Sequence, residues 1–121
     1  GLPDLHELNK NIKKETILVA AMLANNETGV IFPIKEISAI VHDHQSLLFC
    51  DATQAPGKMR VDVNDLGADL LCISGHKMYG PKGTGALFVR RKNPRVKIAP
   101  LLFGGGHENG LRSGSLNVPG I

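Results

Sequence analysis

Three short apolar runs in the sequence are each followed at once by polar side chains that are suited to chemistry. In chain order these side chains are Asn25 and Asn26, then Asp51, Thr53 and Gln54, and then Ser74, His76 and Lys77. They supply amides, a carboxylate, hydroxyls, an imidazole and an amine. If the runs are neighbouring parallel strands, these groups converge on one pocket, because ligands of open α/β sheets bind outside the carboxyl ends of the strands.

The carboxylate of Asp51 and the amine of Lys77 allow two interpretations. A carboxylate at the end of a buried strand is costly unless a cation or hydrogen bonds compensate it, so Lys77 could be its salt-bridge partner. Alternatively, Asp51 pairs with a cationic ring nitrogen while Lys77 forms an imine with an aldehyde. This second arrangement is the one that a pyridoxal-phosphate site needs.

The residues around this pair favour the second interpretation. Ser74 and His76 flank Gly75 just before the lysine, and they offer a hydroxyl and an imidazole to a phosphate group. Gln54 and Asn26 can donate hydrogen bonds to the phenolate oxygen of a pyridoxal ring. The sequence therefore predicts that the three strand ends bind pyridoxal 5'-phosphate.

The elements that must position these groups follow from the apolar pattern. The run 16–22 is continuous and predicts a strand buried on both faces, and the runs 47–50 and 69–73 predict two more buried strands. Residues 85–89 predict a fourth strand, antiparallel to the third because only a short Gly/Pro loop separates them. Beyond Asn93 we expect no helix or strand.

Two helices are predicted among these strands. Apolar residues at helical spacing indicate a helix from about Pro3 to Lys13, with Pro3 in its first turn. A second helix opens at Pro33 and carries an apolar face of Ile34, Ile37, Ile40 and Val41. Alternating strands and helices predict the α/β class, with a mostly parallel sheet and flanking helices.

Five strings of the sequence carry a resemblance to a known family. They are Asn25–Gly29, Asp51–Ala55, Ser74–Gly83, Gly104–Glu108 and Arg112–Ser115. Their order and spacing resemble the cysteine desulfurases, the NifS- and IscS-like branch of the class V aminotransferases, over essentially the whole chain. The resemblance implies the fold-type-I large domain of pyridoxal-phosphate transferases. Residues 1–121 would be one partial domain from its centre, with a glycine-rich loop region from about residue 93 to 121.

The resemblance also implies a role for each matching residue. Lys77 would be the Schiff-base lysine and the proton shuttle, and Asp51 would keep the pyridine nitrogen protonated. Gln54 would bond the phenolate oxygen, and Asn26 would lie near the ring and the substrate carboxylate. Ser74 and His76 would contact the phosphate. Ser115 stands where the family commonly has Thr and would reach the phosphate of the other subunit, so a homodimer is implied.

The function implied is conversion of L-cysteine to L-alanine, with the sulfur passed as a persulfide to acceptor proteins for iron–sulfur cluster or thiocofactor synthesis. The family's nucleophilic cysteine lies downstream of the matching strings, and neither Cys50 nor Cys72 corresponds to it. The abrupt ends of the chain suggest an excised segment, which we expect to be inactive alone. A selenocysteine lyase or another class V relative, and a non-catalytic truncated interaction module, remain alternatives.

Other residues that could do chemistry have simpler interpretations. Lys82 is a rival Schiff-base lysine, but it lies beyond Pro81 in the turn rather than directly after the strand. His42 and His44 could bind a metal, but residues two apart on a helix face different ways, so we expect solvated surface and no metal.

Composition excludes several classes of function. The net charge is only +3 and aromatic residues make up 4%, so the basic stretch 90–97 lacks the interleaved aromatics of a nucleic-acid surface. No apolar run is long enough to span a membrane. Two cysteines within apolar runs and no secretory pattern predict a reducing, cytoplasmic compartment.

Overall fold

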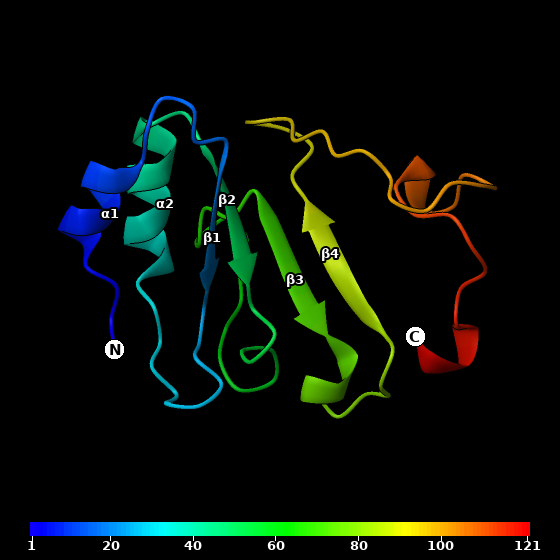
Figure 1. Cartoon of the computed structure of the whole chain (residues 1–121). Helices are drawn as coiled ribbons and strands as arrows, with labels where there is room; N and C mark the ends of the chain where they lie inside the picture. The colour runs from blue at the N-terminus through cyan, green and yellow to red at the C-terminus, as the bar shows by residue number, and fades with distance from the viewer.

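The computed structural model describes all residues, 1–121, and its elements alternate between helix and strand along the first half of the chain (Figure 1). The helices and strands are α1 (Leu5–Asn11), β1 (Leu18–Met22), α2 (Ile34–Asp43), β2 (Leu47–Asp51), β3 (Leu70–Ser74) and β4 (Gly85–Val89). Three short 3-10 turns, η1 (Gly75–Lys77), η2 (Glu108–Gly110) and η3 (Val118–Gly120), complete the secondary structure.

The four strands form one sheet in the order β1-β2-β3-β4. The first three are parallel, and β4 is antiparallel to β3. In Figure 1 the arrowheads of β1, β2 and β3 therefore all point to the same edge of the sheet. The predicted α/β class, the mostly parallel sheet and the antiparallel fourth strand are confirmed.

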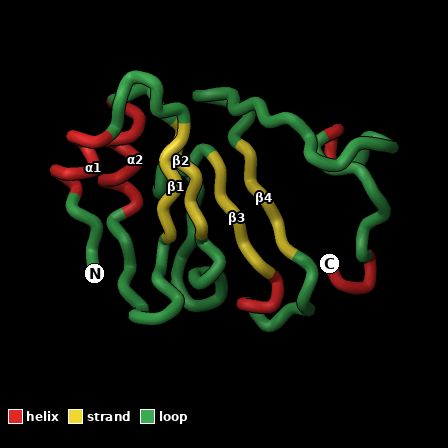
Figure 2. Tube along the Cα trace, in the orientation of Figure 1, coloured by secondary structure: helices red, strands yellow, loops and turns green.

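The core lies between α2 and the sheet. Ile34, Ile37 and Val41 on one face of α2 are at most 2% exposed, and they pack with Leu48 and Leu71 from the strands. Full burial of such a side chain stabilises the fold by about 1.5–3 kcal/mol. Helix α1 packs on α2 rather than on the strands, so both helices lie over the same part of the sheet (Figure 2).

The expectation that the strands are buried on both faces is wrong for β1. Leu18 is 44% exposed, and Ala20, two residues on and on the same face, is exposed too. In β2 the burial alternates, with Leu48 and Cys50 buried and their neighbours only half-buried. The reason is that the helices cover one face of the sheet, and no element of this chain covers the other.

Helix α1 is shorter than predicted, and its first turn does not include Pro3. Asp4 is the N-cap, and its carboxylate accepts hydrogen bonds from the backbone N–H groups of His6 (2.9 Å) and Glu7 (3.0 Å). A carboxylate at this position satisfies amides that the helix leaves unpaired. Helix α2 begins as expected, directly after Pro33.

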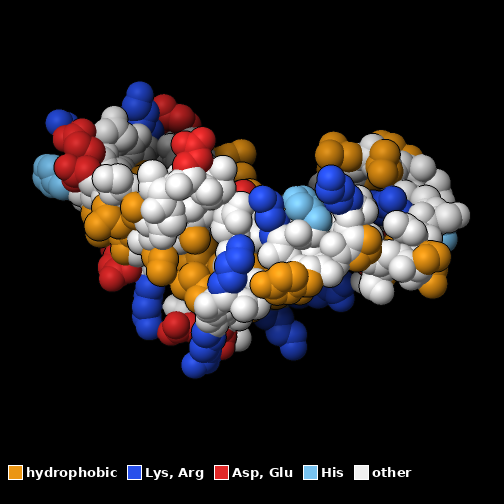
Figure 3. Space-filling model, turned by 90° about the horizontal axis from the view of Figure 1, so that it is seen from below, with side chains coloured by type: hydrophobic (Ala, Val, Ile, Leu, Met, Phe, Trp, Pro, Cys, Tyr) orange, Lys and Arg blue, Asp and Glu red, His pale blue; other side chains and the backbone are white.

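Residues 93–121 contain only the turns η2 and η3 and run alongside β4 away from the helices (Figures 1 and 2). Apolar side chains are exposed there, including Leu101 (91%) and Phe103 (84%). Seen from the carboxyl ends of β1–β3, this segment stands apart from the rest of the molecule, with a hollow between them (Figure 3). Neither helix has the length and apolar character that crossing a membrane requires.

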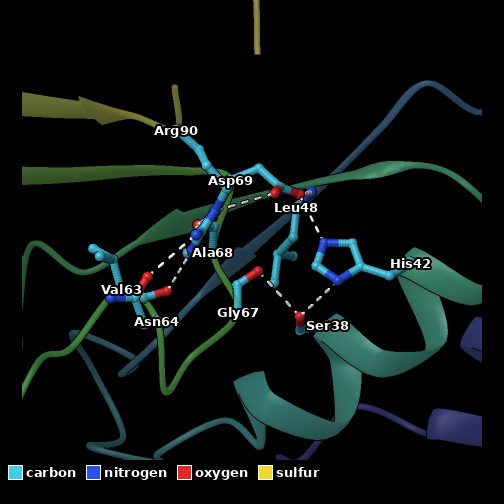
Figure 4. A network of polar contacts seen from close by, with 9 residues as sticks. All are labelled: Ser38, His42, Leu48, Val63, Asn64, Gly67, Ala68, Asp69 and Arg90. Atoms are coloured by element: carbon cyan, nitrogen blue, oxygen red, sulfur yellow. Dashed lines mark hydrogen bonds and ion pairs between the residues drawn. The ribbon is translucent and has the colours of Figure 1, made fainter. Parts of the chain in front are cut away.

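A buried carboxylate, Asp69, joins the sheet to α2 at the edge opposite the arrowheads (Figure 4). It is fully buried immediately before β3. Its Oδ2 lies 2.8 Å from Nε2 of His42 and accepts the backbone N–H of Leu48 at 2.9 Å. The interpretation of His42 as purely solvated surface is therefore wrong, because the histidine is held against a buried acid.

Arg90, directly after β4, completes this polar cluster. Its Nε lies 3.5 Å from Oδ1 of Asp69, an oxygen that has no hydrogen bond. The guanidinium also donates to the carbonyls of Val63 and Ala68 at 2.9 Å each. One buried anion thus ties together α2, β2, the start of β3 and the end of β4.

We expect the Asp69→Ala substitution to lower the free energy of unfolding by about 3–5 kcal/mol, because it leaves the Arg90 guanidinium half-buried without its counter-charge. Urea unfolding measures this. The matched control is Asp65→Ala, which removes an exposed ion pair with Lys35 and should cost less than about 1 kcal/mol. Equal losses in the two variants would contradict a structural role for Asp69.

Candidate active site

The register of the parallel strands aligns their carboxyl ends. Met22 of β1 is the Cα partner of Asp51 in β2, and Asp51 is the partner of Cys72 in β3. Partners in a parallel ladder point to the same face, so Asp51 lies between two sulfur-containing side chains. The loops that follow the three strands leave the sheet at this edge (Figure 1).

The loop after β1 is fixed by Asn25. Its side-chain oxygen accepts hydrogen bonds from the backbone N–H groups of Glu27 and Thr28, both at 2.9 Å, and from the Thr28 hydroxyl at 3.1 Å. Its amide nitrogen lies 3.4 Å from Sδ of Met22. Because Asn25 is occupied within its own loop, Asn26 is the amide of the pair that stays exposed.

The exposed amide of Asn26 and the amide of Gln54 line one cleft of about 510 Å³. The cleft lies between the loop after β1 and the loop after β2, and Lys58 and Met59 form part of its wall. Two amides and an ammonium group can bind an oxyanion or a carboxylate. The structure therefore brings together two of the predicted site residues that lie 28 positions apart in the sequence.

Asp51 is an ionised carboxylate without a cation. Its Oδ1 accepts the backbone N–H of Thr53 at 2.9 Å and the thiol of Cys72 at 3.5 Å. Burial raises the pKa of Asp51, but the hydrogen bonds from Thr53 and Cys72 outweigh it, so the pKa lies below its usual value. No ion pair joins Asp51 to Lys77, so the salt-bridge interpretation of this pair is wrong.

Lys77 ends the turn η1, directly after β3. Within this turn the Ser74 hydroxyl lies 2.8 Å from Nδ1 of His76, so the two predicted phosphate ligands are adjacent. The turn needs Gly75, because a Cβ there would lie 2.5 Å from the Thr84 hydroxyl. Lys77 is exposed, and its amine makes no hydrogen bond or ion pair with this chain.

Ser115 is not brought to the other site residues in this chain. It is exposed, and its carbonyl accepts a hydrogen bond from Nη1 of Arg112 at 3.3 Å. The neighbouring hydroxyl of Ser113 is buried instead and accepts the backbone N–H of Gly106 at 3.2 Å. The chain then returns to the β3–β4 turn, where a Cβ on Gly120 would lie 2.8 Å from the methyl group of Thr84.

The sequence pattern did not single out Cys72. It reads as a small apolar residue of a buried strand, yet it is half-buried and in contact with Asp51. No local signal in the sequence could have found it, because the pairing of Cys72 with Asp51 depends on the register between β2 and β3, in which Ser74 extends two residues beyond Asp51. Cys50 is fully buried on the opposite face, as expected from its apolar run.

Basic side chains surround this edge of the sheet. In the view onto the carboxyl ends, Lys and Arg side chains and a histidine gather between the main body and the C-terminal segment (Figure 3). No group of three or more His, Cys, Asp or Glu side chains is arranged to hold a metal ion. The basic side chains suit this edge to an anionic ligand.

The known family with this pattern is identified by comparison. The family model described as Aminotransferase class-V matches residues 1–120. The chain belongs to the class-V aminotransferase family. Members of this family depend on pyridoxal phosphate.

Individual relatives agree with this assignment. The mitochondrial cysteine desulfurase of Saccharomyces cerevisiae is 56% identical over 119 residues, which are 98% of this chain and 24% of that protein. A solved NifS-like protein matches with a TM-score of 0.91 at 41% identity, over 98% of this chain and 32% of that one. The structure of SspA in complex with cysteine matches with a TM-score of 0.90 at 39% identity, over 98% and 34%. The chain thus spans between a quarter and about a third of these relatives.

The residues present fit pyridoxal phosphate. A protonated pyridine nitrogen needs an anionic acceptor, and Oδ2 of Asp51 makes no hydrogen bond or ion pair within the chain. An aldehyde needs an uncommitted amine, which Lys77 provides. Ser74 and His76 present their polar groups side by side in a tight turn, where a phosphate could accept from both.

We expect Cys50 to resist alkylation in the folded protein. Burial raises its pKa to about 12, so almost none of it is the reactive thiolate at pH 8. Its rate with iodoacetamide, followed by peptide mass spectrometry, should be at least about 100-fold lower than in urea. Cys72, which is half-buried, serves as the internal comparison and should react faster than Cys50. Native labelling of Cys50 at the rate seen in urea would contradict its burial.

Proposed function

We propose that the protein containing this chain is a pyridoxal-phosphate-dependent cysteine desulfurase. The observation that carries the proposal is Asp51, an anion with one uncommitted oxygen in the middle of the aligned strand ends. An uncommitted lysine, Lys77, follows the adjacent strand. The names of two relatives, a cysteine desulfurase and a protein solved in complex with cysteine, support L-cysteine as the substrate.

Two residues carry the chemistry in this proposal. When bound, pyridoxal phosphate supplies an electron sink that stabilises negative charge on the substrate carbons. Asp51 would accept the N–H of the pyridine ring through Oδ2 and so maintain the positive charge of the ring. Lys77 would hold the cofactor through Nζ, and its amine, when free, would move protons to and from the substrate carbon atoms.

Binding is assigned to the polar groups around them. Ser74 and His76 would donate to the phosphate, and Gln54 would donate to the phenolate oxygen. Asn26, on the other wall of the same cleft, orients the substrate carboxylate. Ser115 contacts the phosphate of a second subunit, which accords with its exposed position in this chain and implies a homodimer.

The sulfur acceptor lies outside the residues of this chain. A thiol R–SH and L-cysteine give the persulfide R–SSH and L-alanine, so the C–S bond of cysteine breaks and an S–S bond forms. The acceptor must be a thiolate, and both Cys50 and Cys72 have raised pKa values. Acceptor proteins then take the sulfur from the persulfide, in a reducing compartment that preserves free thiols.

We expect pyridoxal phosphate to attach to Lys77 in the full-length protein. Incubation, borohydride reduction and peptide mapping should place the adduct on Lys77, and Lys77→Ala should lose both the adduct and the yellow absorbance band. The matched control is Lys82→Ala, an exposed lysine five residues on, which should retain both. An adduct on Lys82, or an absorbance band that survives in Lys77→Ala, would contradict the assignment of Lys77 as the cofactor-binding lysine.

We also expect Asp51→Asn to reduce kcat for alanine formation by about 100-fold or more, because a neutral amide cannot keep the ring nitrogen protonated. Steady-state assays of alanine release measure the loss. Asp62→Asn is the matched control. Asp62 also has a lowered pKa, caused by its hydrogen bond with Arg60, but it lies in the β2–β3 loop and should leave kcat unchanged. Comparable rates for Asp51→Asn and the unmodified enzyme would overturn the role of Asp51.

A further inference from the structure

The two oxygens of the Asp51 carboxylate have different surroundings. Oδ1 receives the backbone N–H of Thr53 at 2.9 Å and the thiol of Cys72 at 3.5 Å. Oδ2 receives neither and takes part in no ion pair. Both donors of the chain are thus placed on one oxygen, and the other oxygen is left for a ligand.

Strand register places the thiol at this point. Cys72 is the Cα partner of Asp51 across the β2–β3 ladder, so the two side chains extend from the same face of the sheet. The hydroxyl of Thr53 lies 4.0 Å from Sγ of Cys72. Cys50, the remaining titratable residue of these strands, points into the core on the opposite face.

The thiol and the carboxylate act on each other's charge. Burial raises the pKa of Cys72, and the negative charge of Asp51 raises it further. Burial alone would raise the pKa of Asp51, but hydrogen bonds from Thr53 and from Cys72 lower it below its usual value. At neutral pH, Cys72 is therefore a protonated donor and Asp51 is an anion.

We propose that Cys72 is a positioning residue for Asp51, whose thiol holds Oδ1 so that Oδ2 faces the ring nitrogen of the cofactor. The identity of the ligand rests on the proposed function, whereas the contact between the two side chains does not. A thiol is a weak donor. It orients the carboxylate but lowers the pKa of the carboxyl group less than a hydroxyl would. A carboxylate of higher pKa holds the proton of the ring nitrogen up to a higher pH.

The first test follows alkylation of Cys72 against pH in the full-length protein without cofactor. In Asp51→Asn the negative charge is lost, so the apparent pKa of Cys72 should fall and its rate at pH 8 should rise about threefold or more. Asp62→Asn is the control and should leave the profile unchanged. An unshifted profile in Asp51→Asn would overturn the proposal. So would a uniform rise at every pH, because that reports exposure rather than charge.

The second test replaces the thiol. In Cys72→Ala the donor is lost, so the pKa of the Asp51 carboxyl, followed by carbon-13 NMR, should rise. Cys72→Ser keeps a donor and should restore the original pKa or lower it. In the cofactor-loaded protein, the pH at which the absorbance band changes should move upward for Cys72→Ala and not for Cys72→Ser. The same Asp51 pKa in all three proteins would overturn the proposal.

The outcomes separate this proposal from the proposed function. A shifted Cys72 profile together with no adduct on Lys77 would remove the desulfurase assignment, and with it the ring nitrogen as the ligand of Asp51. An adduct on Lys77 together with an unshifted Cys72 profile would overturn the role of Cys72 and leave the desulfurase assignment in place.

Discussion

The parallel register of β1, β2 and β3 is the constraint on which the site depends. It aligns Met22, Asp51 and Cys72 across the sheet, so that the polar loops after the strands all leave at one edge. A slip of one residue in β2 would turn Asp51 toward α2 and bring its apolar neighbours to the ligand face. A carboxylate with no counter-ion would then be buried in the core, which is costly enough to exclude that register.

A second carboxylate, at the opposite edge of the sheet, has different surroundings. Asp69 is fully buried and surrounded by His42, Arg90 and the backbone N–H of Leu48. Asp51 is only half-buried, accepts hydrogen bonds on one oxygen and has no cation. The Asp69 carboxylate is compensated within the chain and holds elements together. Asp51 keeps one oxygen free of hydrogen bonds and ion pairs, as expected of a group that binds a ligand.

Much of this arrangement could be predicted from the sequence. The apolar runs predicted the strands and their directions, and the polar residues at the strand ends predicted the candidate pocket. Both signals are local properties of the sequence. The exposed face of β1 and the contact of His42 with Asp69 could not be predicted in this way. Both depend on which elements pack together, and the thiol contact of Asp51 likewise depends on a register between segments 21 residues apart.

The measurement that tests the central claim most directly is a crystal structure of the full-length protein with pyridoxal phosphate. The account predicts that Nζ of Lys77 is bonded to the aldehyde carbon and that Oδ2 of Asp51 lies within hydrogen-bond distance of the ring nitrogen. Oδ1 should remain on the N–H of Thr53. A cofactor bound away from these strand ends, or one whose ring nitrogen faces a group other than Asp51, would contradict the account.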